Sequence, residues 1–321
     1  MDAEHLHIAV SSDSNYLEQA LVLINSVIDS NRKCFKNISI HFLSYNVKSE
    51  QLSQIQTVVE GNGCHFEIYD LSDIRQRLGI AIPNTIAISA YSRLFLSSII
   101  APSIHKIIYM DVDAINVQSL SPLWSLDIFD YSVCGVLDDV DVRAKINIGL
   151  DANSLYVNSG FLLINLEYWR RNHLQSKFID FLVSHDGNVF HHDQGIINAI
   201  CHDSLKILPP QYNVMTNFFM LDYRKSNMNS FYSQDKVDQA LSTPVFIHYT
   251  PGVVNRPWCK NCKHPLTQKY LSFRAKAGLS KDNLTSDNRP LRVRFLCWTF
   301  FNARPLYNAI IVLRSKLSKK I

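Results

Sequence analysis

The feature that most constrains this chain is the alternation of strand and helix signals along its first 115 residues. Short apolar runs typical of buried strands are separated by stretches whose apolar residues recur at helical spacing. These signals predict strands at 6–10, 38–43, 65–71 and 106–110, and helices at 16–28, 51–59 and 89–100. Strands separated by helices imply βαβ units and a mainly parallel sheet, in which ligands bind at the carboxyl ends of the strands.

The α/β pattern continues past residue 115, and the chain then changes character. Strands are predicted at 132–137, 156–166 and 245–249, and helices at 167–185 and 193–201. Residues 276–290 are polar and have the composition of a linker. The length of 321 residues and these signals predict three parts: one α/β domain at 1–275, a linker at 276–290 and a tail at 291–321.

Charge is distributed unevenly along the chain. The formal net charge is +4, but Arg289 to Ile321 holds eight basic residues and no acidic one. The other 288 residues carry 24 Lys and Arg against 28 Asp and Glu, so the body is slightly acidic. An acidic body argues against a protein that wraps nucleic acid, and we expect the basic tail to act as a separate electrostatic device.

Several features predict a cytoplasmic location. The seven cysteines are scattered and odd in number, which does not fit a disulfide framework and favours a reducing compartment. The acidic start Met1–His5 does not fit a signal peptide. The most apolar long window, 295–313, is interrupted by Asn302, Arg304 and Pro305, so no transmembrane helix is expected.

The sharpest local signal is the pair Asp111 and Asp113, directly after the apolar run 106–110. Two carboxylates two residues apart at a strand end can bind one hard cation such as Mg²⁺ or Mn²⁺. His248 lies in the strand predicted at 245–249, and an imidazole ligand favours Mn²⁺ over Mg²⁺. The structural alternative is two solvated loop aspartates and a hydrogen-bonded histidine.

Two further polar groups have alternative interpretations. The segment His192–Gln194 opens a predicted helix, where Asp193 is either an N-cap or part of a polar trio beside a ligand. Cys259, Cys262 and His264 resemble part of a zinc site, but no second Cys/His pair with suitable spacing lies near them. The sequence contains no P-loop, no Gly-x-Ser-x-Gly elbow and no complete dinucleotide fingerprint.

Taken in order, these motifs resemble those of glycosyltransferase family 8, retaining enzymes that use a UDP-sugar and Mn²⁺ on a GT-A fold. The resemblance covers about residues 6–271 and consists of six blocks: Ile8–Asn15, Ile88–Leu94, Ile108–Asp113, Tyr156–Leu166, His192–Gln194 and His248–Trp258. Arg256 stands where the family usually has lysine, and the last block is about two residues longer than the common form.

The resemblance implies a role for residues in each block. It implies that the backbone of Ala9 holds the uridine with Asp13 and Asn15, and that the donor sugar is held by Arg93, Asn158 and Asp193. It implies Mn²⁺ ligands, with Mg²⁺ a weaker alternative, at Asp111, Asp113 and His248, and diphosphate contacts at Gly252 and Arg256. The candidate catalytic residues are Gln194 near the anomeric carbon, Asp193, and Asp138 on the acceptor side.

The implied activity is transfer of a hexose from UDP-glucose or UDP-galactose to a cell-surface glycan or lipopolysaccharide acceptor. The sequence does not identify the sugar or the linkage. Two alternatives remain at this stage: a catalytically silent relative that binds a nucleotide sugar or docks on a membrane, and a self-glucosylating protein of the glycogenin type.

The tail combines aromatic and basic residues. Residues 291–301 combine Phe295, Leu296, Trp298, Phe300 and Phe301 with two arginines, and 306–320 places apolar residues at helical spacing with bases following. This pattern is typical of a segment that lies in the interface of an anionic membrane. The sequence therefore predicts a peripheral protein on the cytoplasmic face of the membrane; the alternative is that the aromatic residues pack on the catalytic domain.

Overall fold

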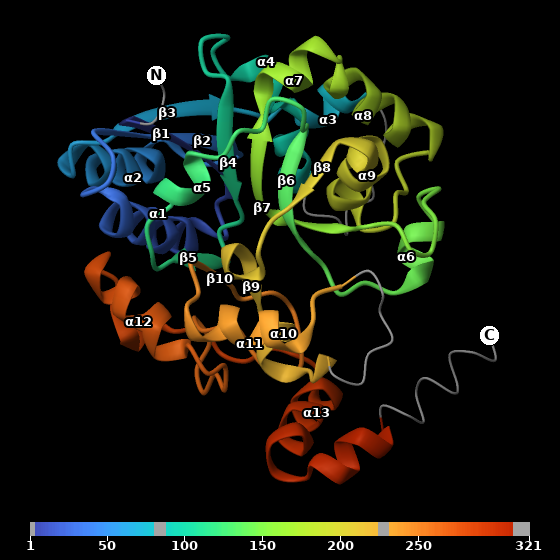
Figure 1. Ribbon diagram of the computed structural model, residues 1–321. Coiled ribbons are helices and arrows are strands. Elements are labelled where there is room, and N and C mark those ends of the chain that lie inside the picture. Colours follow the sequence, from blue (N-terminus) through green and yellow to red (C-terminus); the bar gives the residue numbers. More distant parts are fainter. Residues whose placement is uncertain (1–3, 80–87, 224–230, 311–321) are drawn as a thin grey trace. The chain divides into compact units, whose positions relative to one another are not determined.

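The computed structural model describes residues 4–79, 88–223 and 231–310, and the chain forms two compact units, Met1–His248 and Tyr249–Ile321. The first unit is built on a seven-stranded sheet (Figure 1). In spatial order its strands are β3 (His65–Asp70), β2 (Asn37–Tyr45), β1 (His5–Asp13), β4 (Lys106–Met110), β7 (Val157–Asn165), β6 (Val133–Leu137) and β8 (Leu205–Ile207).

The pairing of the strands confirms the predicted mainly parallel sheet. β1 pairs in parallel with β2 and β4, β2 pairs in parallel with β3, and β6 with β8. β7 runs antiparallel to both of its neighbours, β4 and β6. The polar ends of β1 and β4 therefore meet at one edge, with Val10 beside Met110 in the register.

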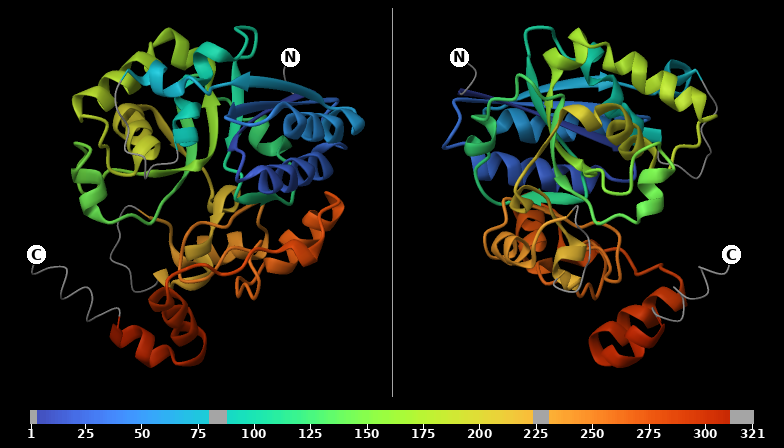
Figure 2. Two further views of the ribbon diagram at one scale, coloured as in Figure 1. Left: turned by 180° about the vertical axis from the view of Figure 1, so that it is seen from behind. Right: turned by 45° about the vertical axis from the view of Figure 1, so that its right-hand side comes forward.

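Both faces of the sheet are covered, because successive side chains of a strand point to opposite faces. In β4, Ile108 and Met110 pack with one hydrophobic cluster, whereas Ile107 and Tyr109 pack with the other. The first cluster includes α1 (Leu17–Asn31), α2 (Ser49–Gly61) and α5 (Ser121–Trp124). The second includes α7 (Leu166–Arg171), α8 (Leu174–Ser184), α9 (His192–Cys201) and the 3₁₀ helix η2 (Ile88–Phe95). Figure 2 shows α1 and α2 on one side of the sheet and α8 and α9 on the other.

Two predicted helices differ from those observed. The helix predicted at 89–100 is the 3₁₀ helix η2 followed by the single turn α4 (Leu96–Ile99). The tighter winding lets the Arg93 side chain donate to the carbonyl of Ala90 at 3.0 Å. The helix predicted at 167–185 is divided into α7 and α8, because His173 adopts a left-handed backbone conformation with φ of 53°.

A small second sheet adjoins the carboxyl end of β4. It consists of β5 (Ala114–Asn116), β10 (Phe246–His248) and β9 (Val214–Met215), and β10 lies in the middle. β10 pairs antiparallel with β5, so that His248 lies opposite Ala114. This register places His248 beside the residue that follows Asp113.

The remaining helices of the first unit are short connections: α3 (Ile74–Leu78), α6 (Val142–Ile146), α10 (Thr216–Met220), α11 (Gln234–Ser242), and the 3₁₀ turns η3 (His202–Ser204) and η4 (Pro210–Asn213). The second unit contains α12 (Thr267–Lys276), the 3₁₀ turn η6 (Lys281–Asn283) and α13 (Leu291–Asn302). Thr285, within the predicted linker, donates its backbone N–H to Trp258 and accepts from Lys260 at 3.0 and 2.8 Å. No helix in the described part of the chain has the length and apolarity needed to cross a bilayer.

Candidate active site

The two aspartates predicted to bind a cation lie where β4 ends, and the structure brings His248 to them. Ligand atoms of Asp111, Asp113 and His248 all lie within 4.8 Å of one another. His248 Nε2 is 2.9 Å from Asp113 Oδ1 and 4.0 Å from Asp111 Oδ2. Two carboxylates and one imidazole form a ligand set that suits a divalent transition metal.

This cluster is built from backbone pairing. β4 continues its pairing with β7 past Met110, because the N–H of Asp111 donates to the carbonyl of Gly160 at 2.8 Å. The register of β5 and β10 brings His248 from the other side. The ligands therefore come from strand ends, which hold a constellation more rigidly than loops.

Arg93 lies beneath the aspartates and is almost fully buried. Its Nη2 donates to Asp111 Oδ1 at 2.8 Å, its Nε lies 3.1 Å from Asp193 Oδ2, and its Nη1 donates to the carbonyl of Ser159 at 2.6 Å. Its guanidinium lies 4.1 Å from the centre of the Tyr109 ring. Arg93 therefore neutralises one predicted metal ligand and one predicted sugar ligand together. Burial nevertheless raises the pKa of Asp193, although the charge of Arg93 opposes this shift.

A network of amides and one carboxylate lies beside this pair. Asp138 Oδ2 accepts from Asn158 Nδ2 and from Gln194 Nε2, both at 3.0 Å. Gln194 Oε1 accepts from Asn158 Nδ2 and from the backbone N–H of Ser159, both at 3.1 Å. Because these hydrogen bonds fix both amide planes, Gln194 and Asn158 are held ready for a ligand. The structure thus brings together Asp138, Asn158, Asp193 and Gln194.

A pocket opens between the end of β1, η2 and the two aspartates. It is lined mainly by polar and aromatic residues, together with the apolar Ala90 and Val112: Ser11, Tyr16, Ser89, Ala90, Arg93, Tyr109, Asp111, Val112 and Asp113. Tyr16 is the aromatic side chain at its mouth that the sequence did not single out, and it is 41% exposed.

The uridine residues predicted on β1 take different positions from one another. Ala9 is buried in the interior of β1, where it pairs with His41 and Tyr109. Asp13 Oδ1 accepts from the backbone N–H of Asn15 at 2.8 Å and so shapes the turn after the strand. Ser11 and Tyr16 line the pocket on either side of that turn in the sequence.

Gly252 and Arg256 belong to the second unit, and their predicted diphosphate contacts stay a prediction. Arg256 Nη1 donates to the carbonyl of Tyr249 at 2.6 Å, and its guanidinium lies 5.6 Å from the Trp258 ring centre. In the same unit Cys262 Sγ contacts the carbonyl of Asn255. Among the described residues, the aspartate–histidine cluster is the one group of three such side chains arranged to hold a metal, so zinc at the cysteines gains no support.

Besides Tyr16, sequence reasoning missed three side chains that bond the predicted site residues. Ser159 Oγ donates to Asp193 Oδ2 at 3.1 Å, Tyr109 donates to Asp111 Oδ1 at 3.1 Å, and Asn213 contacts His248. Ser159 and Tyr109 lie inside blocks that were singled out for other residues. Asn213 follows two prolines ahead of a two-residue strand, and no pattern in the sequence marks it.

The fold and this site define a class, the GT-A nucleotide-sugar transferases. The chain resembles solved structures of the galactosyltransferase LgtC. An active-site variant of LgtC superimposes with a TM-score of 0.71 at 22% identity, covering 84% of this chain and 96% of that one. A complex of LgtC with donor and acceptor sugar analogues gives 0.68 at 23% identity, with the same coverage.

The chain belongs to glycosyltransferase family 8, whose family model matches residues 7–262. General stress protein A of Bacillus subtilis is 26% identical over 273 residues, 84% of this chain and 93% of that protein. The lipopolysaccharide 1,3-galactosyltransferase of Salmonella typhimurium is 21% identical over 310 residues, 94% of this chain and 88% of that protein. These findings confirm the predicted family, the GT-A fold and a hexosyl-transferring enzyme.

Proposed function

We propose that this protein is a retaining, Mn²⁺-dependent transferase that moves galactose or glucose from a UDP-sugar to a cell-surface glycan or lipopolysaccharide acceptor. The observation that carries the proposal is the convergence of Asp111, Asp113 and His248 beside a pocket whose other wall is Arg93. Similarity to the lipopolysaccharide 1,2-glucosyltransferase of Escherichia coli and to the Salmonella galactosyltransferase supports the acceptor class.

The pocket suits a nucleoside diphosphate. Tyr16 offers an aromatic ring on which a flat base can stack, and Ser11 and Ser89 offer polar groups at the end of β1. Asp111 and Asp113 of the cation cluster line the same pocket, so a cation bound there could contact the diphosphate. Two carboxylates and an imidazole fit Mn²⁺ better than Mg²⁺. When bound, the cation would neutralise negative charge on the diphosphate leaving group.

The amide network would act on the sugar. Gln194 bonds both Asn158 and Asp138, and Asp193 accepts from Ser159 Oγ. These polar groups would bind the hydroxyl groups of the donor sugar. In the transfer the bond between the anomeric carbon and the diphosphate oxygen breaks, and a bond to the acceptor oxygen forms on the same face. The acceptor proton leaves with the diphosphate, and Gln194 supplies polar stabilisation without a covalent step.

A panel of UDP-sugars tests this proposal. Release of UDP without acceptor is measured with Mn²⁺, with Mg²⁺ and with EDTA. We expect hydrolysis of UDP-galactose or UDP-glucose that depends on Mn²⁺. Binding of a UDP-sugar without any release of UDP would identify a catalytically silent relative. A gain of one or more hexose masses in the intact protein would identify self-glucosylation.

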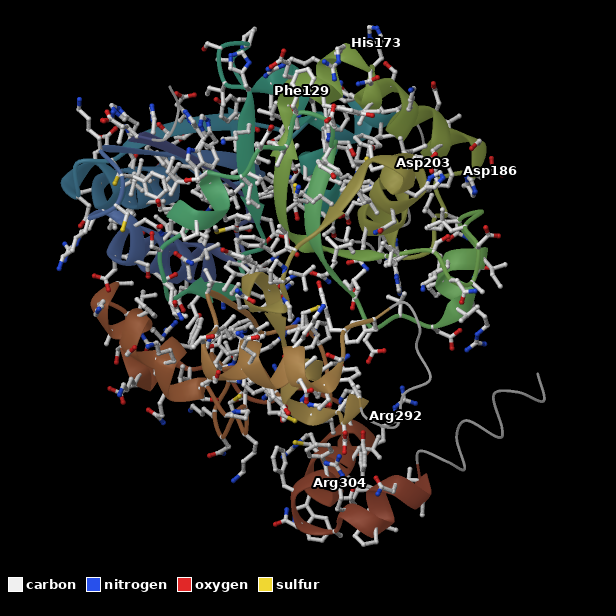
Figure 3. The ribbon with its side chains drawn as sticks, viewed as in Figure 1. Phe129, His173, Asp186, Asp203, Arg292 and Arg304 are labelled. Carbon is white, nitrogen blue, oxygen red and sulfur yellow. The ribbon has the colours of Figure 1, made fainter. Side chains whose placement is uncertain are left out.

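We further propose that the basic, aromatic tail holds the protein on an anionic membrane. The exposed face of α13 carries Leu291, Phe295 and Trp298, which are 78%, 51% and 55% exposed. Phe295 and Trp298 stack with ring centres 6.2 Å apart. Arg294 is exposed one turn from Trp298, and helical residues continue over 304–310. Figure 3 shows Arg292 near the first turn of α13 and Arg304 just beyond its last turn.

The predicted remainder of this segment lies outside the described residues: Leu313, Arg314, Lys316, Leu317, Lys319 and Lys320. Leu296 and Phe300 of α13 are each 9% exposed, so only part of the apolar surface of this helix is covered. A monomer gains nothing from leaving three large apolar side chains in water, whereas an interfacial helix buries them in the headgroup region.

Vesicle binding tests the role of the tail. A variant with Phe295→Ala and Trp298→Ala should lose binding to phosphatidylglycerol vesicles while UDP-sugar hydrolysis stays largely unchanged. Phe129→Ala, at an aromatic residue 60% exposed elsewhere on the surface, is the matched control. Binding of the wild type should weaken as salt is raised. Wild-type protein that ignores anionic vesicles at low salt would refute the role of the tail.

A further inference from the structure

One buried amide connects the cation cluster to the amide network. Asn213 ends η4 directly before β9, and its side chain is fully buried. β9 pairs with β10 so that Met215 lies beside His248. Asn213 Oδ1 is 3.1 Å from His248 Nδ1, and Asn213 Nδ2 is 2.9 Å from Asn158 Oδ1. Asn213 thus contacts a predicted metal ligand and a predicted sugar ligand.

The hydrogen-bond partners determine which atom of each amide is the oxygen. The backbone N–H of Gly160 can only donate, so the atom of Asn158 that it contacts at 3.0 Å is the carbonyl oxygen. The atom of Asn213 that faces this oxygen must then be the NH₂ group. The carbonyl oxygen of Asn213 therefore faces His248 Nδ1, which must carry a proton to donate to it.

This assignment decides the state of the other ring nitrogen. With the proton on Nδ1, the neutral imidazole of His248 has a lone pair on Nε2. Nε2 lies 2.9 Å from Asp113 Oδ1 and 4.0 Å from Asp111 Oδ2. The lone pair and the two carboxylates face one another, so together they form a set of acceptors that can bind one cation. Hydrogen bonds behind a ligand histidine set its tautomer and orientation in this way.

We propose that Asn213 is the positioning residue of this site, which fixes His248 with its Nε2 lone pair toward the cation and also holds Asn158 in place for the sugar. This inference rests on the proposed metal-dependent function and adds a residue that joins its two halves. Because the Asn213 side chain contacts both residues, it would fix the orientations of His248 and Asn158 together.

The first test uses Asn213→Leu, which keeps the branched arrangement of side-chain heavy atoms and removes both hydrogen bonds. Mn²⁺ alone is titrated into the metal-free protein and free Mn²⁺ is followed by electron paramagnetic resonance. We expect the dissociation constant for Mn²⁺ to increase 10- to 100-fold. This is the loss of affinity found when the hydrogen-bond partner of a metal-binding histidine is removed. Long-range ¹H–¹⁵N spectra, with His248→Ala for assignment, should show the Nδ1–H tautomer in the wild type and its loss in Asn213→Leu.

The matched control is Asn165→Leu. Asn165 is buried at the other end of β7, away from the cluster, where its side chain bonds the backbone of Tyr168, Ile128 and Phe129. This variant should lower thermal stability without changing Mn²⁺ affinity or the tautomer. Equal losses of affinity in both variants, or less than a threefold loss in Asn213→Leu, would overturn the inference.

Asn213→Asp separates the two roles and serves if Asn213→Leu does not fold. The aspartate still accepts from His248 Nδ1, but it faces the oxygen of Asn158 with another oxygen. We expect Mn²⁺ affinity within about threefold of wild type and UDP-sugar hydrolysis at saturating Mn²⁺ reduced at least tenfold. A tenfold loss of Mn²⁺ affinity in Asn213→Asp, or UDP-sugar hydrolysis at the wild-type rate, would contradict the roles assigned to Asn213. His248→Ala distinguishes the failures: if it binds Mn²⁺ as the wild type does, the metal site itself is wrong.

Discussion

Gly160 and His248 approach each other so closely that no side chain fits between them. A Cβ added at Gly160 would lie 2.2 Å from His248 Cε1 and 2.7 Å from Asp111 Oδ2. The backbone of Gly160 has no positive φ, so its conformation does not require glycine. Glycine is required because there is no room for a side chain. The missing side chain lets β7 pass behind the cation cluster while its carbonyl accepts from Asp111. The cluster thus depends on a residue that offers it no ligand.

Gly160→Ala should therefore destroy the cluster. The methyl group must displace His248 or Asp111, since 2.2 Å is far below van der Waals contact. We expect Mn²⁺-dependent hydrolysis to fall at least 100-fold and stability to fall by about 1–3 kcal/mol, as in overpacked cores. Gly61→Ala is the control, because nothing lies within 4 Å of its added Cβ. If Gly160→Ala keeps wild-type Mn²⁺ affinity, the backbone geometry described for the cluster is wrong.

Asp111→Asn and Asp113→Asn should each abolish transfer and leave the fold intact. An amide has the shape of the carboxylate but not the negative charge that a hard cation needs. Circular dichroism and hydrolysis at saturating Mn²⁺ are measured for each variant, with the exposed Asp130→Asn as control. More than about a tenth of wild-type activity, a barrier increase below roughly 1.4 kcal/mol, would contradict the assignment.

His248→Ala should weaken Mn²⁺ more than Mg²⁺. Nitrogen ligands favour the transition metal, and Mg²⁺ prefers oxygen and water. The measurement is the concentration of each ion that gives half-maximal UDP release, in wild type and variant. The half-maximal concentration of Mn²⁺ should increase by a larger factor than that of Mg²⁺. Equal losses for both ions would mean that His248 has a structural role.

The sequence predicted the longer strands and the polar residues at their ends, because buried strands and their boundaries are local signals. It did not predict the two- and three-residue strands β5, β8 and β9, which are too short to give a pattern. It did not predict how residues far apart in the chain are brought together. The pairing of His248 with Ala114 joins segments more than 130 residues apart and depends on register. The engagement of Arg93 with both Asp111 and Asp193 likewise depends on the winding of η2.

A group of histidines on β1, β2 and β3 should make the stability of the fold depend on pH. His7 Nδ1 lies 3.0 Å from His41 Nε2, and His41 Nδ1 lies 3.1 Å from the hydroxyl of Tyr69, which donates to Glu67. Burial lowers the pKa of His7 to about 3 and that of His41 to about 4. Three neighbouring imidazoles, those of His5, His41 and His65, also lower the pKa of His7, whereas Glu67 opposes the lowering of the pKa of His41.

Stability should therefore fall as the pH falls below 6.5. The unfolded chain protonates both histidines near pH 6.5, whereas the folded protein keeps them neutral down to about pH 4, so the unfolded state binds more protons in between. Each histidine contributes a slope of about 1.4 kcal/mol per pH unit. Urea unfolding between pH 4.5 and 6 measures this slope, and His7→Gln should reduce it by that amount. His105→Gln, at a histidine whose side chain is 55% exposed, is the control. An unchanged slope in His7→Gln, or an equal change in His105→Gln, would show that the cluster does not cause the acid sensitivity.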